Sequence, residues 1–457
     1  MSWIEDGLPE GMGERLGKAV TLVREADRVR VLCHYDADGT AAAAVLTQTL
    51  LRENQEVHVT LSHVLNQDRL ERATEGAVDL LLVSDMGSAQ VDLLEAVKAP
   101  VLVLDHHQPL RDSETVVQLN PHFFGLQGTR DACGATTSFL LAMALNEANL
   151  DLAGVALVGC IGDRQHIGGF KGINALLFDR AEARGILQAE SAPALADLPL
   201  AEALHFSVGP YFRGLSGREE AIQEFLSELG LDPGRRIRDM DSAHREHLLS
   251  ALSLRLVQQE IRPETVQHLV EKKFWYPPYE VYVDDLESLV NASSRQGAES
   301  LGLALSLGDF RERKEAEGLR EKHWTAVLRG LHKVEDEGAF AKAHTQFFYA
   351  EGPTLAGSVA GVAMRYLLDQ EKPTLGLAVA DGETKVSARG TDYLISRGVD
   401  LAEALREGAQ AVGGSGGGHN IASGATIPKG KEEGFLEAVD AVVGRQRASA
   451  ETNGEPQ

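Results

Sequence analysis

Short apolar runs alternate with helical stretches through the first part of the chain. Four runs have the aliphatic and β-branched content of strands: residues 28–34 (RVRVLCH), 56–62 (EVHVTLS), 79–85 (DLLLVSD) and 100–107 (PVLVLDHH). An alanine- and leucine-rich helical segment, residues 40–51, follows the first run. Strands separated by helices indicate βαβ units. We therefore predict an α/β fold that begins with a parallel sheet flanked by helices.

The pattern changes twice further along. Residues 134–185 are predicted to form helices, and residues 190–300 are mostly helical and charged, with FWYPPYEVYV at 274–283 as an interruption. From about residue 320 strand and helix patterns return: strands at 325–331, 345–351, 374–381 and 384–390, and helices at 357–369 and 399–410. We predict a catalytic domain at 1–190, a mainly helical connecting region at 191–320, a smaller C-terminal α/β domain at 321–446, and a disordered tail at 447–457.

Composition narrows the class of protein. A chain of 457 residues with 43% hydrophobic residues can form two or three soluble domains. It has no apolar run long enough to cross a bilayer and its first residues lack a secretory pattern, so we expect a cytoplasmic protein with no membrane partner. Cys33, Cys133 and Cys160 are scattered, and buried reduced thiols are expected rather than a zinc site.

The net charge of −24 argues against a nonspecific nucleic-acid coat, which is normally basic. It does not argue against a metal-dependent nuclease, because carboxylates that hold divalent cations are neutralised in the folded site.

Polar clusters stand where the predicted strands end. His34, Asp36 and Asp38 occur in HYDADG, and if the strand continues through them, alternate residues share one face. Asp85 ends the third run; Asp105, His106 and His107 end the fourth; Asp163 ends a helix. Ligands of parallel sheets bind at the carboxyl ends of the strands. Each cluster alone is more often a cap, a turn or a hydrogen-bonded pair, but the four together predict a metal site.

The donors define the metal chemistry. Carboxylates and imidazoles without thiolates suit manganese or magnesium better than structural zinc. The number of carboxylates suggests two metal ions bridged by one of them, an arrangement that activates water and stabilises the leaving oxygen in phosphoryl transfer.

These motifs resemble a known family. DHH at 105–107, with HYDADG before it, SD at 84–85, and GD at 162–163, resembles the DHH phosphoesterase superfamily. GGGHNIASGA near the C-terminus resembles its DHHA1 domain. NASSRQG at 291–297, KVSARGT at 385–391 and GGGHNIASGATIP resemble the archaeal RecJ-like exonucleases most. The resemblance covers about residues 28–175 and 320–446.

The resemblance implies a role for each metal-site residue. His34 and Asp36 are expected to bind one ion, Asp38, Asp163 and His106 the other, and Asp85 to bridge them. Asp105 is expected to orient the histidines, and His107 to face the scissile phosphate. The family has two divalent ions, with Mn²⁺ preferred and Mg²⁺ possible. One departure is His34, where bacterial RecJ has an aspartate. Inactive replication-helicase relatives have lost metal ligands, whereas this chain retains all of them, which implies an active enzyme.

The glycine-rich run GGSGGGH at 413–419 could be a linker, but it lies inside the predicted C-terminal domain. Glycines let backbone N–H groups approach a phosphate closely. The resemblance implies substrate contacts from the following residues of this domain: Ser387, Arg389, Gly416, Gly417, Gly418 and His419. For Arg389 the alternative is a surface salt bridge. Asn291 and Arg295 match the family pattern, and packing explains them as well as substrate binding does.

The function expected from the resemblance is a metal-dependent phosphodiesterase, most of all a single-strand-specific exonuclease that releases mononucleotides in DNA replication or repair. The expected partner is single-stranded DNA or RNA, with replication factors such as GINS as possible protein partners. Two alternatives stay open: an oligoribonuclease or cyclic-dinucleotide phosphodiesterase, and a replisome-associated binding or scaffold protein.

Overall fold

The structure, a computed structural model, describes residues 7–380 and 382–453 and divides into two compact units. Unit 1 consists of Met1–Ser191 and Lys272–Arg320; unit 2 consists of Ala192–Glu271 and Glu321–Gln457. The chain passes between the units three times, close to or within β6 (Gln188–Pro193), β7 (Val270–Tyr276) and α15 (Arg313–Glu337). Each unit therefore contains segments that are distant in sequence.

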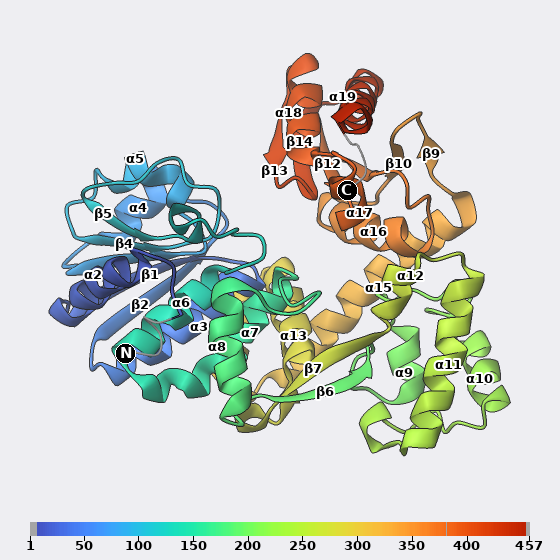
Figure 1. The fold of residues 1–457 in the computed structure, drawn as a ribbon, viewed down its shortest axis with the longest axis horizontal. Coiled ribbons are helices and arrows are strands. Elements are labelled where there is room, and N and C mark those ends of the chain that lie inside the picture. Colours follow the sequence, from blue (N-terminus) through green and yellow to red (C-terminus); the bar gives the residue numbers. More distant parts are fainter. Residues whose placement is uncertain (1–6, 381, 454–457) are drawn as a thin grey trace. The chain divides into compact units, whose positions relative to one another are not determined.

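A parallel five-stranded sheet forms the centre of unit 1 (Figure 1), with strand order β2-β1-β3-β4-β5. Its strands are β1 (Arg28–His34), β2 (Glu56–Ser62), β3 (Leu80–Ser84), β4 (Val101–Leu104) and β5 (Val116–Leu119). The first four confirm the predicted runs; β5 was not among the predicted strands. The strand order reverses between β1 and β3, which is where open α/β sheets bind ligands.

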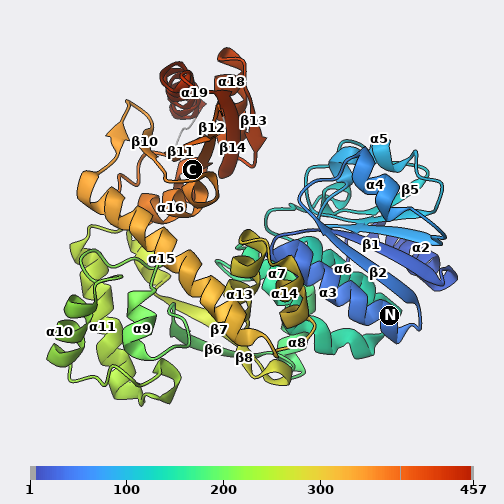
Figure 2. The ribbon, with the colours of Figure 1, turned by 180° about the vertical axis from the view of Figure 1, so that it is seen from behind.

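Helices cover both faces of this sheet, as predicted. One apolar cluster packs helices α2, α3, α6 and α7 against one face, and a smaller cluster that includes Leu70, Val91 and Leu94 from α4 and α5 covers the other. The helices of unit 1 are α2 (Met12–Glu25), α3 (Ala37–Arg52), α4 (Gln67–Ala73), α5 (Val91–Leu94), α6 (Gly134–Leu145), α7 (Ala153–Gly162), α8 (Gly172–Ala183), α13 (Val283–Arg295) and α14 (Glu299–Ser306). Figure 2 shows α13 and α14 from the other side of the molecule.

The second half of the FWYPPYEVYV segment pairs with its first half. In unit 1, Trp275 pairs with Tyr282 and Tyr276 with Val281, which joins β7 to β8 (Val281–Tyr282) in an antiparallel ladder. Strand β6 completes this three-stranded sheet in the order β6-β7-β8.

Unit 2 combines a helical part with a six-stranded mixed sheet, in the order β13-β14-β12-β11-β10-β9. The strands are β9 (Phe340–Ala341), β10 (Gln346–Tyr349), β11 (Thr374–Ala380), β12 (Glu383–Arg389), β13 (Ser415–Gly418) and β14 (Ala422–Pro428). The helices are α9 (Leu200–His205), α10 (Glu219–Glu228), α11 (Ser242–Gln258), α12 (Pro263–Gln267), α16 (Pro353–Tyr366), α17 (Asp392–Ser396), α18 (Leu401–Ala411) and α19 (Glu432–Asn453).

Three predictions about the C-terminal half differ from the structure. Residues 325–331 belong to α15 and not to a strand, because Val327, Leu328 and Leu331 follow helical spacing and are buried in the helical core of unit 2. The glycine run at 415–418 is strand β13 rather than a loop. Helix α19 continues to Asn453, where a tail was expected from 447; residues 454–457, and Asp381 at the end of the predicted strand 374–381, lie outside the described residues.

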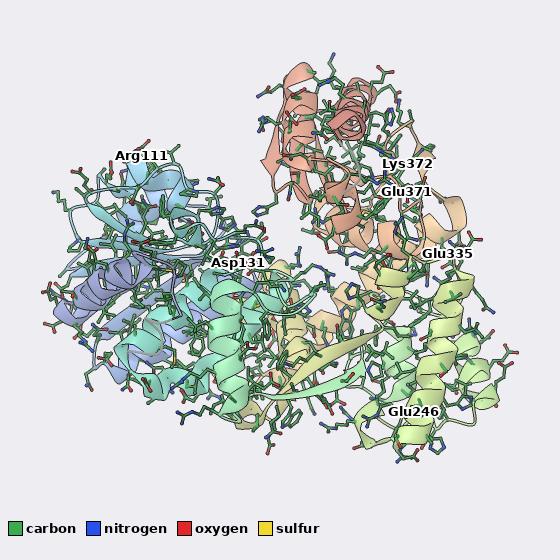
Figure 3. The ribbon with its side chains drawn as sticks, viewed as in Figure 1. Arg111, Asp131, Glu246, Glu335, Glu371 and Lys372 are labelled. Atoms are coloured by element: carbon green, nitrogen blue, oxygen red, sulfur yellow. The ribbon has the colours of Figure 1, made fainter. Side chains whose placement is uncertain are left out.

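Polar contacts join separate segments of unit 2. Glu335 of α15, labelled in Figure 3, accepts hydrogen bonds from the Tyr211 hydroxyl and from the Gly214 N–H, the latter at 3.2 Å. Glu371, also labelled, pairs with Arg262 and accepts a hydrogen bond from the Tyr393 hydroxyl at 2.8 Å.

Among the helices of residues 7–380 and 382–453, every one is too short or too polar to cross a bilayer.

Candidate metal centre

The candidate site lies at the carboxyl edge of the parallel sheet in unit 1. The strand register pairs Cys33 with Ser84 and Ser84 with Leu104, so β1, β3 and β4 end side by side. His34, Asp85 and Asp105 are the residues at these three ends. The sheet therefore brings together groups that are far apart in the sequence.

The HYDADG segment turns from strand into helix. Strand β1 ends at His34, Asp36 is the N-cap of α3, and Asp38 lies in the first turn of that helix. Asp36 accepts a hydrogen bond from the Gly39 N–H at 3.1 Å. The expectation that alternate residues of one strand present these side chains is therefore wrong: the strand-to-helix turn presents them instead.

Asp85 lies between two groups of potential ligands. Its Oδ2 is 3.5 Å from His34 Nδ1, and its Oδ1 is 3.2 Å from His106 Nε2. The residue adopts a left-handed backbone with φ of 56°, unusual outside glycine, and is 2% exposed. Strained backbone of this kind is typical of functional sites, because the surrounding structure must hold it.

The second group gathers around His106. Its Nε2 is 3.3 Å from Asp163 Oδ2 and 3.7 Å from Asp38 Oδ2. Its Nδ1 contacts the Gly128 carbonyl oxygen at 2.6 Å, which orients the ring so that Nε2 faces the carboxylates.

Asp38 is anchored at the start of α6. Its carboxylate accepts hydrogen bonds from the N–H groups of Gly134 at 2.6 Å and Ala135 at 2.8 Å. The start of a helix carries unpaired N–H groups and partial positive charge, which stabilise a buried carboxylate.

Asp105 organises the DHH segment. It is fully buried and accepts hydrogen bonds from the N–H groups of Ser88 at 2.9 Å, His106 at 2.8 Å and His107 at 3.1 Å. The His107 Nδ1 is 2.9 Å from Asp105 Oδ1 and 3.9 Å from Asp85 Oδ1. The His107 side chain is 43% exposed, so it is the histidine of the pair that substrate can reach.

Burial and mutual repulsion perturb the pKa values of the carboxylates. Burial, followed by the charges of Asp85 and Asp163, raises the pKa of Asp38 well above its usual range. Burial also raises the pKa of Asp163, to about 6. Burial acts in the same direction on Asp85, but the neighbouring imidazoles of His106 and His34 outweigh it and lower the pKa of Asp85.

The histidines shift in the opposite direction. Burial lowers the pKa of His34, but the carboxylates of Asp36 and Asp85 raise it by more. The net result is a pKa of about 11. Burial likewise lowers the pKa of His106, and Asp163 and Asp85 raise it well above normal. The raised pKa values of the two histidines reflect the negative charge of the neighbouring carboxylates, the same charge that would attract a cation.

The residues present fit divalent cations. Three groups have donor atoms within 4.8 Å of one another: His34, Asp36 and Asp85; Asp38, His106 and Asp163; and Asp85, Asp105, His106 and His107. Among the described residues, His34 Nδ1 and Asp85 Oδ2 are buried without a hydrogen-bond partner. Oxygen and imidazole donors with unsatisfied buried atoms are suited to manganese or magnesium. The cysteines contribute no ligand to these groups; all three are buried free thiols, as expected.

Two glycines that the sequence did not single out make room for Asp38. A Cβ on Gly159 of α7 would lie 2.2 Å from Asp38 Oδ1, and a Cβ on Gly134 of α6 would lie 2.9 Å from Asp38 Oδ2. Glycines inside helices are otherwise unfavourable. In the sequence, Gly159 stands four residues before Asp163 in VGCIGD, whereas Gly134 is far from the motif residues along the chain.

The predicted substrate residues lie on neighbouring strands of unit 2. Ser387 and Arg389 belong to β12, Gly416, Gly417 and Gly418 to β13, and His419 begins the turn that leads to β14. Strand β14 separates β12 from β13, and Ser387 and Gly417 are both paired with Gly424. The structure thus brings all six residues together in one region of the sheet.

Arg389 lies against α16. Val386 and Ala388 are buried in the core with α18 and α19, so Ser387 and Arg389 point to the opposite face. A Cβ on Gly357 of α16 would lie 2.5 Å from Arg389 Nη2. Arg389 is therefore positioned by α16 and is half-buried rather than a mobile surface residue.

Comparisons with known proteins agree with this geometry. Residues 28–160 match the N-terminal domain of the DHH family, and residues 344–445 match the DHHA1 domain. An uncharacterized protein of Methanocaldococcus jannaschii is 29% identical over 95% of this chain and 98% of its own length. The single-stranded-DNA-specific exonuclease RecJ of Thermus thermophilus is 30% identical over 34% of this chain and 25% of its own length.

Solved structures share the fold. Exonuclease RecJ bound to manganese superposes with a TM-score of 0.57 at 21% identity, over 96% of this chain and 97% of that one. CDC45 from Entamoeba histolytica superposes with a TM-score of 0.65 at 11% identity, over 95% of this chain and 98% of that one. The two domains and their motifs define a phosphoesterase of the α/β class. The chain belongs to the DHH/DHHA1 superfamily and is RecJ-like.

Proposed function

We propose that the protein is a single-strand-specific exonuclease of the RecJ type, which releases mononucleotides by hydrolysis with two divalent ions, Mn²⁺ preferred. The observation that carries this proposal is Asp85, whose two carboxylate oxygens face different groups, Oδ2 toward His34 and Oδ1 toward His106. A carboxylate so placed supports two neighbouring metal sites. When bound, the metals supply an activated water and neutralise charge on the phosphate.

The remaining residues have separable roles in this proposal. His34 and Asp36 hold one ion; Asp38, His106 and Asp163 hold the other. His107, exposed beside them, donates a proton to the leaving oxygen from Nε2, because Asp105 occupies its Nδ1. Asp105 itself positions the His107 ring.

Phosphates further along the strand are held in unit 2. The open edge of β13 carries backbone N–H groups with no side chains to obstruct them, since Gly416, Gly417 and Gly418 follow one another there. Arg389 adds a planar guanidinium suited to phosphate. The complete set of ligand-type residues supports an enzyme rather than a scaffold alone.

Digestion of end-labelled single strands tests the proposal. We expect labelled DNA or RNA single strands to be shortened with manganese, less with magnesium and not with EDTA, while duplexes resist. A length series from a dinucleotide upward separates this activity from an oligoribonuclease or cyclic-dinucleotide phosphodiesterase, which prefers the shortest substrates. Failure to hydrolyse any single strand with manganese contradicts the proposal.

Arg389→Ala tests the phosphate contact in unit 2. We expect a higher KM on a long oligonucleotide, little change on a dinucleotide, and a log–log salt dependence flatter by about 0.7. The matched control is Arg445→Ala, which removes an exposed arginine paired with Glu407 at 2.8 Å in the same unit and should leave both values unchanged. Equal defects on the two substrates identify Arg389 as structural.

A further inference from the structure

Three aromatic rings stand in a row from the metal centre to the surface of unit 1. The Tyr35 ring meets the His34 ring edge-on, with centroids 4.9 Å apart and an interplanar angle of 80°. The Tyr35 ring also stacks on His63, with centroids 3.6 Å apart and an angle of 22°. Since His34 pairs with Ser62 in the β1–β2 register, Tyr35 and His63 are the next residues beyond the ends of these strands.

The outer ring is presented to solvent and held in place. The His63 side chain is 62% exposed, and its Nε2 lies 3.2 Å from Glu299 Oε1 at the start of α14. Tyr35 is partly exposed beside it. An aromatic ring that is exposed, stacked on a second ring and fixed by a carboxylate offers a flat face to a ligand.

The charge around the site selects the kind of ligand. The chain carries a net charge of −24, and the candidate metal ligands are carboxylates and imidazoles, so bound metal ions rather than basic side chains would hold the phosphate there, and the base needs a contact of another kind. Stacking on a ring does not require opposite charge, and it tolerates every base because each base has a π-face. The sugar keeps the base of a nucleotide a short distance from its phosphate, which matches a ring row that begins at a metal ligand.

We propose that Tyr35 and His63 form a stacking platform for the nucleobase of the nucleotide whose phosphate lies at the metal centre. This inference rests on the proposed function and narrows its substrate class. The platform selects base-bearing nucleotides with little sequence preference, and gives no advantage to abasic or inorganic phosphoesters.

Substrates with and without a terminal base test the platform in the full-length protein with manganese. His63→Ala should raise KM about 5- to 150-fold for a normal oligonucleotide. The increase should disappear when the terminal nucleotide at the degraded end is abasic. His63→Phe, which keeps a ring but not the bond to Glu299, should restore most of the loss. Tyr35→Phe should be close to wild type because the ring is retained.

His244→Ala is the matched control. His244 is also an exposed histidine paired with a carboxylate, Asp241, at 2.7 Å, but it lies in unit 2. It should leave KM unchanged on both substrates. The platform proposal is refuted if His63→Ala raises KM equally for normal oligonucleotides and for oligonucleotides that are abasic at either end. It is also refuted if His63→Ala has no effect on KM.

A binding measurement separates this inference from the proposed function. A dinucleotide with terminal 2-aminopurine loses fluorescence when that base stacks. Quenching by wild type and not by His63→Ala supports the platform even if no oligonucleotide is hydrolysed, an outcome that would refute the exonuclease alone. Hydrolysis of oligonucleotides without His63-dependent quenching refutes the platform alone.

Discussion

Replacing Asp105 with asparagine should separate positioning of His107 from metal binding. The carboxylate is fully buried and accepts four hydrogen bonds, three from backbone N–H groups and one from His107. Burial raises its pKa, but the bond from His107 and the charges of both histidines lower it from the ordinary 3.8 to about 2. That difference corresponds to about 2 kcal/mol in favour of the charged form in the folded protein.

The sign of the pH dependence follows from this lowered pKa. Because the folded-state pKa of Asp105 lies below the unfolded value, its contribution to stability is complete above pH 3.8 and is lost as the pH falls through about 2. Asp105→Asn should therefore reduce the free energy of unfolding of the metal-free protein at neutral pH by about 2 kcal/mol. The difference from wild type should shrink in acid. Denaturant unfolding with EDTA at a series of pH values measures it.

Turnover should respond through His107. Burial lowers the pKa of His107, and the hydrogen bond to Asp105 raises it above normal. Without the carboxylate the imidazole loses its proton at lower pH, so the alkaline limb of the pH–rate profile should move to lower pH. Turnover should fall about 10²-fold or more, with metal content unchanged.

Asp79→Asn is the matched control. Asp79 also has a pKa lowered to about 2, by hydrogen bonds from Arg28, but it precedes β3 at the opposite edge of the sheet. It should leave turnover and the pH profile unchanged. Loss of metal from Asp105→Asn, or wild-type turnover in that variant, would refute the positioning role.

Two further predictions concern other residues in and around the metal centre. Gly159→Ala should destabilise the protein by about 1–3 kcal/mol and impair metal binding, because its Cβ would lie 2.2 Å from Asp38 Oδ1. The control is Gly17→Ala in α2, where a Cβ would have no atom within 4 Å. Thermal unfolding should show this control to be neutral or stabilising. The His106→Ala variant should lose bound manganese, whereas the His107→Ala variant should keep its manganese and lose turnover. Elemental analysis of both variants measures the metal content, and equal metal loss would contradict separate roles for the two histidines.

The elements of unit 1 follow from the sequence because their patterns are strong. A strand buried on both faces of a parallel sheet is a continuous apolar run, and β3 and β4 have this form. The strand predicted at 325–331 was wrong because a short apolar run such as TAVL fits a strand as well as a helix. Only the wider spacing, which extends through Val334 in the core, identifies α15.

The candidate site was predictable in its members but not in its geometry. His34, Asp85 and the DHH segment stand at strand ends, a position that sequence patterns locate well. The left-handed backbone of Asp85 and the space left by Gly159 depend on packing between distant segments, and no local pattern encodes them. Likewise, the pairing of β13 and β14 makes a strand of glycines whose own propensity favours a loop.

The threefold passage of the chain between the units affects synthesis on the ribosome. Residues 192–271 emerge early, but their apolar core in unit 2 is completed by Val327, Leu331 and Val359, which are made later. Unit 1 similarly waits for Leu286 and Leu289 of α13 before its largest core is complete. Domains generally fold as they leave the ribosome. Unit 1 is complete only once residue 320 has been made, and unit 2 only after residues 321 and beyond have followed. Residues 192–271 therefore leave the ribosome before the segment that completes their core, and their apolar side chains stay unpaired until it has been made.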